Sequence, residues 1–148
     1  MKLSTKGRYA ARAMLDLALN HNKGPVSAKE IAKRQKISER YLENIFSVLS
    51  KAGLVNSTRG KSGGFSLSGN PEDIDLGEII MAVEGSLAPV DCVENSSHCD
   101  RVSICVTYEI WRKLEKAMMD ILSSTTLKDM IDIYNTKNPT PESIMYYI

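Results

Sequence analysis

The sequence has no apolar run that approaches the roughly 20 residues that a membrane-spanning helix requires. Its first residues also lack the apolar stretch that forms the centre of a signal peptide. Only three cysteines and two histidines occur among the 148 residues. These shortages predict a cytoplasmic protein without a membrane partner, in which the fold does not depend on disulfides. A chain of this length can bury a sizeable core without them.

The shortage of histidine also bears on catalysis, because a cysteine nucleophile needs an activating base. His98 is adjacent to Cys99, whereas His21 lies far away at the end of the first predicted helix. The sequence contains no motif typical of a substrate pocket. We therefore expect neither enzymatic activity nor a small-molecule substrate.

The net charge of +1 conceals two halves of opposite sign. Residues 1–62 contain 13 Lys and Arg against 4 Asp and Glu, whereas residues 63–148 contain 6 against 14. A basic half joined to an acidic half predicts that only the first half meets a polyanion. The alternative that charge alone leaves open is a pair of solvated faces.

The basic half has the pattern of a helix-turn-helix. A first amphipathic helix is predicted over residues 7 to about 22. Its predicted apolar stripe consists of Ala11, Met14, Leu15, Ala18 and Leu19. Gly24-Pro25 ends this helix, and the spacing of Ser27 and Glu30 is that of a capping box, which predicts the start of a second helix.

A third helix is predicted from Ser38, its N-cap, to about Ala52. In a helix-turn-helix this helix enters the major groove of DNA. Its predicted inward face holds Leu42, Ile45, Leu49 and Ala52. Its predicted outward face holds Glu39, Arg40, Glu43, Asn44 and Ser47. Arg40 can bond guanine or phosphate, whereas Glu43 is either a partner of cytosine N4 or simply solvated.

Two short strands with a basic, glycine-rich tip are predicted after Gly53, over residues 54–57 and 65–68. Arg59 and Lys61 at this tip can enter a minor groove. A phosphate-binding loop is excluded because no helix pattern follows the glycines. Residues 1–70 are therefore predicted to form a winged helix-turn-helix domain, in a fold that is mainly α with a small β-wing.

Residues 71–135 are predicted to form a loop and a long dimerisation helix. A short helix is expected over residues 75–83, and no helical period is visible over 85–103. From Ile104 onward, apolar residues recur seven apart in two rows, Ile104, Trp111 and Met118 in one and Leu114 and Ile121 in the other. This seam predicts a homodimer on a pseudo-palindromic DNA operator, with burial inside one chain as the alternative.

A last short helix is predicted from the pair Thr126 and Asp129 through about Tyr134. The tail over residues 136–148 contains Pro139 and Pro141 and is predicted to be loosely ordered. We assign it no function.

All three cysteines, Cys92, Cys99 and Cys105, lie within fourteen residues of one another. Thiolates gathered in one short segment suit a soft metal or an iron–sulfur centre better than core packing. An odd number also fits poorly with a closed set of disulfides. The sequence predicts that this segment is the sensor of the molecule, although reversible thiol oxidation is an alternative signal.

Several motifs, in order and at matching separations, resemble those of the Rrf-two (Rrf2) family of bacterial transcription regulators, which includes IscR, NsrR and CymR. They are Lys2–Ala10, Gly24-Pro25-Val26, Ile37-Ser38 with Tyr41-Leu42-Glu43, Arg59-Gly60 with Gly63-Gly64-Phe65, and Cys105 with Trp111-Arg112. The resemblance covers residues 1 to about 135. It implies a dimeric winged-helix repressor or activator that carries an iron–sulfur cluster, of the two-iron, two-sulfur (2Fe-2S) type in IscR, and that controls genes for cluster assembly.

The resemblance also implies roles for individual residues. It implies base reading by Ser38, Arg40, Tyr41 and Glu43, with Arg59 as the minor-groove arginine. It implies that Cys92, Cys99 and Cys105 are cluster ligands, with the first gap one residue longer than in IscR.

The fourth ligand departs from the relatives' patterns. Where IscR has a histidine three residues after its last cluster cysteine, this chain has Tyr108, and where NsrR takes a carboxylate from its first helix, this chain has Arg8. An arginine cannot ligate iron. The remaining candidates are His98, Tyr108, Asp91, Glu94, Asp100 and Glu109, or else water or an exogenous thiol. His98 is the usual donor type, but its adjacency to Cys99 strains chelation of one iron by both.

Two further functions stay open within the same family. One is a cluster-free, thiol-sensing regulator of cysteine metabolism of the CymR kind. The other is a nitric-oxide-sensing regulator of the NsrR kind.

Overall fold

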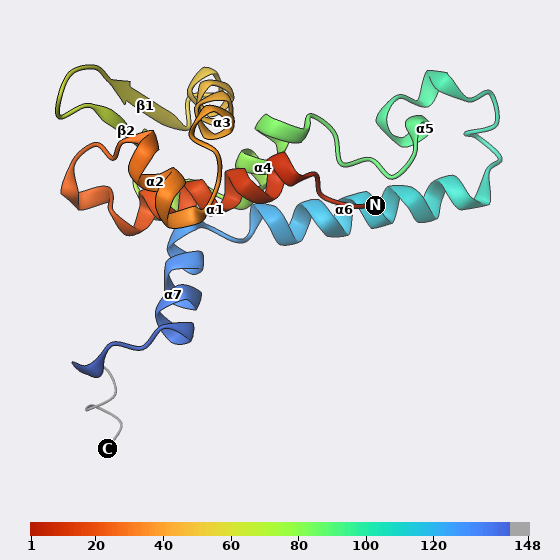
Figure 1. Cartoon of the computed structure of the whole chain (residues 1–148). Helices are drawn as coiled ribbons and strands as arrows, with labels where there is room; N and C mark the ends of the chain where they lie inside the picture. The colour runs from red at the N-terminus through yellow and green to blue at the C-terminus, as the bar shows by residue number, and fades with distance from the viewer. Residues whose placement is uncertain (143–148) are drawn as a thin grey trace.

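The computed structural model describes residues 1–142. In chain order its elements are α1 (Thr5–Leu19), η1 (His21–Lys23), α2 (Ala28–Gln35), α3 (Glu39–Lys51), β1 (Val55–Thr58), β2 (Gly64–Leu67), η2 (Pro71–Asp73), α4 (Leu76–Glu84), α5 (Asp91–Glu94), η3 (Ser96–His98), α6 (Val106–Ser123) and α7 (Leu127–Lys137). Figure 1 shows α2, α3 and the β1–β2 hairpin gathered around one end of α1, while α6 extends away and carries α5 at its far end. The predicted fold class, mainly α with a small β-wing, is confirmed.

Polar side chains at the helix starts fix most of the helix boundaries. The capping boxes predicted for Ser27 and for Thr126 are both formed, and the Ser38 hydroxyl accepts from the Tyr41 amide at 3.1 Å. A cap of this kind stabilises a helix by about 1 kcal/mol. Ser4 caps α1 in the same way, so this helix begins at Thr5 rather than at residue 7 and ends at Leu19, before the short η1.

The predicted stripe of α1 is partly wrong. The apolar side chains that the structure buries are Ala10, Ala13, Met14, Leu17 and Ala18, whereas Ala11, Leu15 and Leu19 are only partly buried. The physical reason is that α1 lies at the centre of the fold, where it packs against α3, α4, α7 and β2. Apolar residues occur nearly all round its second half, so spacing alone does not select the most buried face.

Aromatic stacking holds the wing, β1 and β2, against α3, and a backbone bridge holds it against the segment before α2. Phe46, which the predicted inward face did not include, is fully buried and stacks on Phe65 with ring centroids 4.4 Å apart. Ala52, placed on that face by prediction, is exposed at the C-cap. Val26 and Phe65 exchange two backbone hydrogen bonds of 2.9 and 2.8 Å. A Cβ on Gly64 would lie 2.3 Å from the Val26 carbonyl oxygen, so this approach requires glycine.

The acidic half differs from its prediction at three places. Helix α6 begins at Val106, so Ile104 lies in the preceding loop and is 73% exposed. The segment over residues 85–103, predicted as loop, contains the one-turn α5 and the short η3. Helix α7 continues to Lys137, so the first two residues of the predicted tail are helical, while 143–148 lie outside the described residues.

One core joins both halves of the chain. Ile74, Ile79 and Leu127 are buried in the same cluster as the apolar residues of α1 and α3. Within residues 1–142, no helix is both long and apolar enough to cross a membrane.

Candidate nucleic-acid interface and cysteine loop

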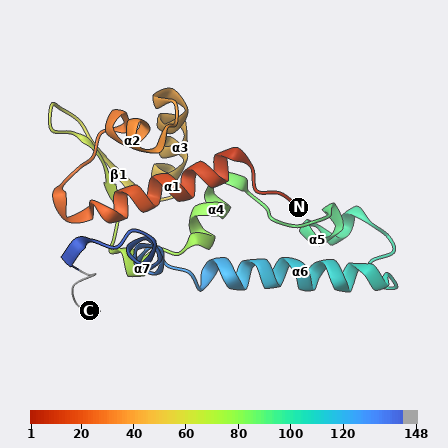
Figure 2. The same ribbon diagram turned by 60° about the horizontal axis from the view of Figure 1, so that its bottom comes forward.

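The face of α3 predicted to meet DNA is exposed. Glu39, Arg40, Glu43, Asn44 and Ser47 all project from the side opposite the buried residues of this helix. The wing residues Arg59 and Lys61 are exposed as well. Figures 1 and 2 place the wing and α3 on the same side of α1. This arrangement presents one protruding helix and one basic tip together, as a major-groove and a minor-groove reader require.

Ser38 and Tyr41 are tied to the protein more closely than the other predicted base readers. The Ser38 hydroxyl accepts from the Tyr41 amide, which leaves its own hydrogen free to donate. The Tyr41 ring is half-buried and meets Tyr9 of α1 edge-on, with ring centroids 5.9 Å apart and planes at 81°. Base contact by these two residues stays a prediction, and their contacts with the fold are an added finding.

The three cysteines lie on the segment farthest from this face (Figure 2). Cys92 is in α5, Cys99 follows η3, and Cys105 is the N-cap residue of α6. All three are half-buried free thiols. They are therefore chemically available as soft ligands or as redox-active groups.

Cys105 is placed to form a thiolate readily. Its Sγ lies 3.3 Å from the Thr107 hydroxyl, and this hydrogen bond, followed by one from the Tyr108 backbone amide, lowers the pKa of the thiol below its ordinary value. The charge of Arg101 acts in the same direction. A thiolate is the form that binds metal and attacks disulfides.

The loop does not bring a full ligand set together. No group of three or more His, Cys, Asp or Glu side chains in the described part of the chain converges as a metal site. The candidate His98 is exposed, and Tyr108 is half-buried one turn after Cys105. The exposed carboxylates are Asp91, Glu94, Asp100 and Glu109, of which Glu109 pairs with Arg112 at 3.2 Å. The donor types suit an iron–sulfur centre, but ligation requires the loop to rearrange.

Helix α6 contains no fully buried residue, and its apolar side chains divide into two faces. Trp111, Leu114 and Met118 from the predicted seam are partly buried within this chain, where α6 packs against α4. The neighbouring face is exposed: Val106 is 77% exposed, Ile110 53% and Ile121 67%. The alternative of burial within one chain therefore accounts for part of the seam, and a second apolar face is left open to solvent.

Comparison with known proteins identifies the family. Residues 3–133 match the family model described as "Rrf2: Iron-dependent Transcriptional regulator". The chain belongs to the Rrf2 family.

Among its relatives, the chain is 44% identical over 131 residues to Protein rrf2 of Nitratidesulfovibrio vulgaris, covering 88% of this chain and 87% of that protein. It is 40% identical to the transcriptional regulator CymR of Bacillus subtilis over all 148 residues, covering 100% of both. The solved structure of an IscR from T. potens has a TM-score of 0.79 and 43% identity, covering 99% of this chain and 97% of that one.

Membership of the Rrf2 family makes the chain a DNA-binding transcriptional regulator and not an enzyme. The resemblance drawn from the motifs is confirmed, and so is the winged-helix architecture. The family includes both IscR and CymR relatives at similar identity, so the comparisons leave the sensed signal undecided.

Sequence reasoning missed an ion pair on a buried carboxylate, between α1 and α2 of the reading head (residues 1–70). Asp16 is 2% exposed and binds Arg34 through two hydrogen bonds of 2.7 and 3.0 Å. The hydrogen bond and charge of Asp16 raise the pKa of Arg34. Arg34 is exposed, and its guanidinium reaches the Asp16 carboxylate of α1. The available signal was an acidic residue between Leu15 and Leu17, in the middle of an apolar run.

It also missed a contact at the root of the cysteine loop. The last residue of α4, Glu84, accepts hydrogen bonds from the backbone amide of Ser4, at 3.0 Å, and from its hydroxyl. A Cβ on Gly7 would lie 2.3 Å from the Glu84 carboxylate, so the glycine admits this contact.

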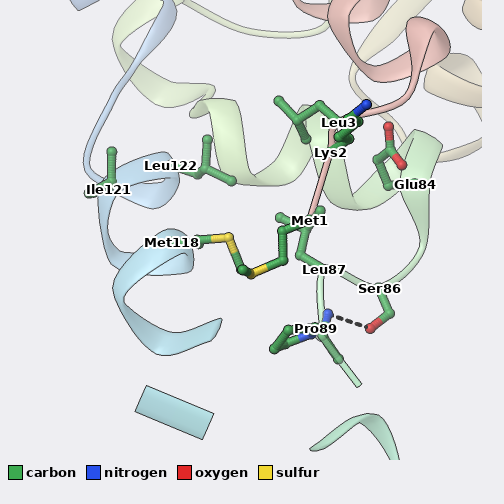
Figure 3. A pocket seen from close by; sticks show the side chains of 11 residues that line it. Met1, Lys2, Leu3, Glu84, Ser86, Leu87, Pro89, Met118, Ile121 and Leu122 are labelled. Carbon is green, nitrogen blue, oxygen red and sulfur yellow. Dashed lines mark hydrogen bonds between the residues drawn. The ribbon is translucent and has the colours of Figure 1, made fainter. Parts of the chain in front are cut away.

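Glu84 borders a cavity of about 430 Å³ where the N-terminal arm, the loop root and α6 meet (Figure 3). Its lining residues are Met1, Lys2, Leu3, Glu84, Ser86, Leu87, Ala88, Pro89, Met118, Ile121 and Leu122. A movement of the loop root, residues 85–89, would therefore change the contacts of the N-terminal arm at the start of α1.

Proposed function

We propose that this Rrf2 protein is a homodimeric, cytoplasmic regulator that senses iron–sulfur cluster status and controls genes for cluster assembly. The observation that carries the proposal is the position of three half-buried free cysteines on one loop, in a chain that matches a family model described as iron-dependent. Residues 1–70 would read DNA, and residues 71–135 would sense and dimerise. The tail over 136–148 is given no role.

Cys92, Cys99 and Cys105 would hold the cluster, which we take to be 2Fe-2S, together with a fourth donor from His98 or Tyr108, a nearby carboxylate, water or an exogenous thiol. Such a cluster supplies reversible one-electron chemistry and sensitivity to oxidation. Thiol chemistry supports this assignment, since soft thiolates are the usual ligands of iron–sulfur centres and Cys105 has a lowered pKa.

The proposed signal passes from the loop to the DNA-reading face. The loop is continuous with α6 through Cys105, and its other end touches α1 through Glu84. The exposed apolar face of α6, with Val106, Ile110 and Ile121, would pair with the same face of a second copy. A twofold dimer presents two α3 helices to a pseudo-palindromic operator.

At each half-site, the proposed base contacts come from Ser38, Arg40, Tyr41, Glu43 and Asn44, with Arg59 and Lys61 in the minor groove. Most of the binding free energy would come from phosphate contacts of the basic half. A dimer with about 6–10 such contacts loses roughly three to five decades of affinity between about 50 and 200 mM salt. Binding without salt dependence would contradict this interface.

Anaerobic purification tests the cluster. We expect a coloured protein that contains iron and sulfide in a 1:1 ratio. Cys92→Ala, Cys99→Ala and Cys105→Ala should each lose most of the iron, while His98→Ala and Tyr108→Phe should show in Mössbauer or resonance Raman spectra which residue is the fourth ligand. Protein that stays colourless, or that binds only zinc, after reconstitution with iron and sulfide would exclude the cluster.

A second candidate is a cluster-free thiol switch, which two observations favour. The chain matches CymR from end to end, and a solved CymR structure is described as that of the global cysteine regulator of B. subtilis. In the described residues the three thiols do not converge with other donors. The signal would then be a sulfenic acid or disulfide, formed first at Cys105. Mass spectrometry after peroxide treatment of the metal-free protein, with operator binding measured in parallel, tests this candidate.

A further inference from the structure

We propose that Arg12 positions the recognition helix for sequence reading, instead of contacting a DNA phosphate. Arg12 is a basic residue at the surface of the DNA-binding half, so phosphate contact is the role that its charge alone would indicate. The structure gives its guanidinium two protein partners: Gln35, just before the turn between α2 and α3, and Tyr9 of α1, whose ring meets Tyr41 just after that turn. The inference rests on the DNA-binding function and is independent of the cluster.

The first partner lies before the turn. The Arg12 Nε donates to Gln35 Oε1 at 3.3 Å, and its Nη2 donates to the Gln35 backbone carbonyl. Gln35 is the last residue of α2. Its own amide donates to the buried Asp16 carboxylate at 3.0 Å, and this carboxylate is also bound by Arg34. One guanidinium therefore holds the C-terminus of α2 through a side chain that is itself fixed by a buried charge.

The second partner, Tyr9, connects Arg12 to α3, which follows the turn. The Arg12 guanidinium lies over the Tyr9 ring, 5.4 Å from its centroid. Tyr9 in turn meets Tyr41 edge-on in the first turn of α3. Both contacts are attractive, because the ring face is negative and the ring edge positive. Arg12 thus contacts Gln35 directly and Tyr41 through one aromatic ring.

The turn between these partners needs support. Lys36 adopts a left-handed conformation with φ of 55°, the single positive φ of a non-glycine residue in the described part of the chain. Left-handed residues other than glycine, asparagine and aspartate are uncommon, since the Cβ meets the backbone. Because this turn sets the angle at which α3 leaves α2, its conformation decides how α3 enters a groove. Contacts that fix both ends of the turn therefore bear on specificity.

Arg8 provides a matched control on the same helix. It is also basic and exposed, and the hydrogen bond that the structure gives its guanidinium goes to Thr5 within α1, at 3.2 Å. Removal of Arg8 changes the net charge by the same amount as removal of Arg12, but it leaves the contacts of α2 and α3 intact. Gln35→Ala provides the complementary variant, since it removes the side-chain bonds of Gln35 to Arg12 and Asp16 without any change in charge, while the backbone carbonyl that accepts from Arg12 remains.

The experiment uses the full chain and two DNA probes: a duplex that the wild-type protein selects from a randomised library, and a random-sequence duplex of equal length. Arg12→Ala should weaken binding to the selected duplex by about tenfold or more, whereas binding to the random duplex should fall no further than it does for Arg8→Ala. Gln35→Ala should show a smaller loss of specificity with an unchanged salt slope, because the Gln35 backbone carbonyl still accepts from Arg12. Arg12→Lys should not rescue it, because an ammonium lacks the fork that binds Gln35 while stacking on a ring.

Equal loss of affinity for both duplexes, with a salt slope reduced by about 1, would assign Arg12 to a phosphate and overturn the inference. Wild-type specificity in Gln35→Ala would overturn it as well. Thermal unfolding of each variant is measured first, and a specificity ratio compared at equal folded concentration removes any effect of stability. If the wild-type protein enriches no duplex from the library, this result contradicts the DNA-binding function and not the positioning role of Arg12.

Discussion

The two regions of this molecule are stabilised in different ways. In the DNA-reading region, α1, α3 and the wing share a buried core, and the wing is held by the stack of Phe46 on Phe65 and by the bridge at Val26. In the proposed sensing region, which comprises the cysteine loop (residues 85–105) and α6, the helix has no buried side chain and the loop lies at its far end. The first region is packed within a single chain, together with α4 and α7, whereas the described part of the second leaves apolar side chains of α6 exposed and three cysteines as free thiols.

This difference indicates where regulation can act. A packed region resists change because its side chains interdigitate, whereas a region with few buried contacts opens at low free-energy cost. Binding of a second copy or of a metal centre would then complete the sensing region and pass its state to a reading head that is already formed.

Phe46→Ala should destabilise the protein by about 3–5 kcal/mol, because it empties a fully buried site and removes the stack that holds the wing. Urea unfolding followed by circular dichroism measures the change. The matched variant Ile110→Ala in α6, where the side chain is 53% exposed, should cost much less at protein concentrations below the dimer dissociation constant. Similar costs for the two variants would show that the sensing region is as well packed as the reading head.

Ile110→Asp should weaken the proposed dimer strongly, because a twofold interface contains each substitution twice and buries both carboxylates. We expect the dimer dissociation constant to rise by about a hundredfold or more, which corresponds to about 2.7 kcal/mol. Analytical ultracentrifugation measures it, with Lys116→Asp on the polar side of the same helix as the control. If both variants dimerise like the wild type, this face of α6 is not the interface.

Glu84→Ala should have a smaller effect, a loss of about 1 kcal/mol in the free energy of unfolding, because two donors of Ser4 lose their acceptor near the surface. Glu84→Gln retains an acceptor oxygen and should lose less. The informative measurement is the ratio of the operator affinities of the protein with and without its proposed cluster. That ratio should move toward one in Glu84→Ala if the loop root transmits the signal, and it should be unchanged if Glu84 only stabilises the fold.

The reading head was more predictable from sequence than the sensing region, for physical reasons. Caps such as Ser27 with Glu30 depend on neighbouring residues, so their spacing identified helix starts that the structure confirms. The inward face of α1 depends on the elements that pack around it, α2, α3, α4, α7 and β2, and apolar spacing identified it only in part. Asp16 was missed because its partners, Arg34 and Gln35, come from another helix.

For the cysteine loop, the sequence indicated the chemistry but not the conformation. Its residue types are informative by themselves, since three cysteines in fourteen residues narrow the chemistry to metal binding or redox activity. Its conformation was not predictable, because α5 and η3 are single turns without a period to detect. Ile104 was placed in the helix because it continues a heptad row. In the structure the loop still includes Ile104, and the helix begins only after its N-cap residue Cys105. The identity of the fourth ligand stays a prediction.

The smallest expected effect concerns the thiol that joins the loop to α6. The Thr107 hydrogen bond is the leading cause of the lowered pKa of Cys105, so Thr107→Val should raise that pKa toward its ordinary value. Since the thiolate is the reactive form, alkylation of Cys105 in metal-free protein should slow a few-fold near neutral pH, and its pH profile should move to higher pH. Peptide-resolved mass spectrometry after iodoacetamide pulses measures the rate. Thr107→Ser retains the hydroxyl and should behave like the wild type. A profile for Thr107→Val that coincides with the wild type would mean that the backbone amides of Tyr108 and Thr107 and the charge of Arg101 activate this thiol without a side-chain contact from α6.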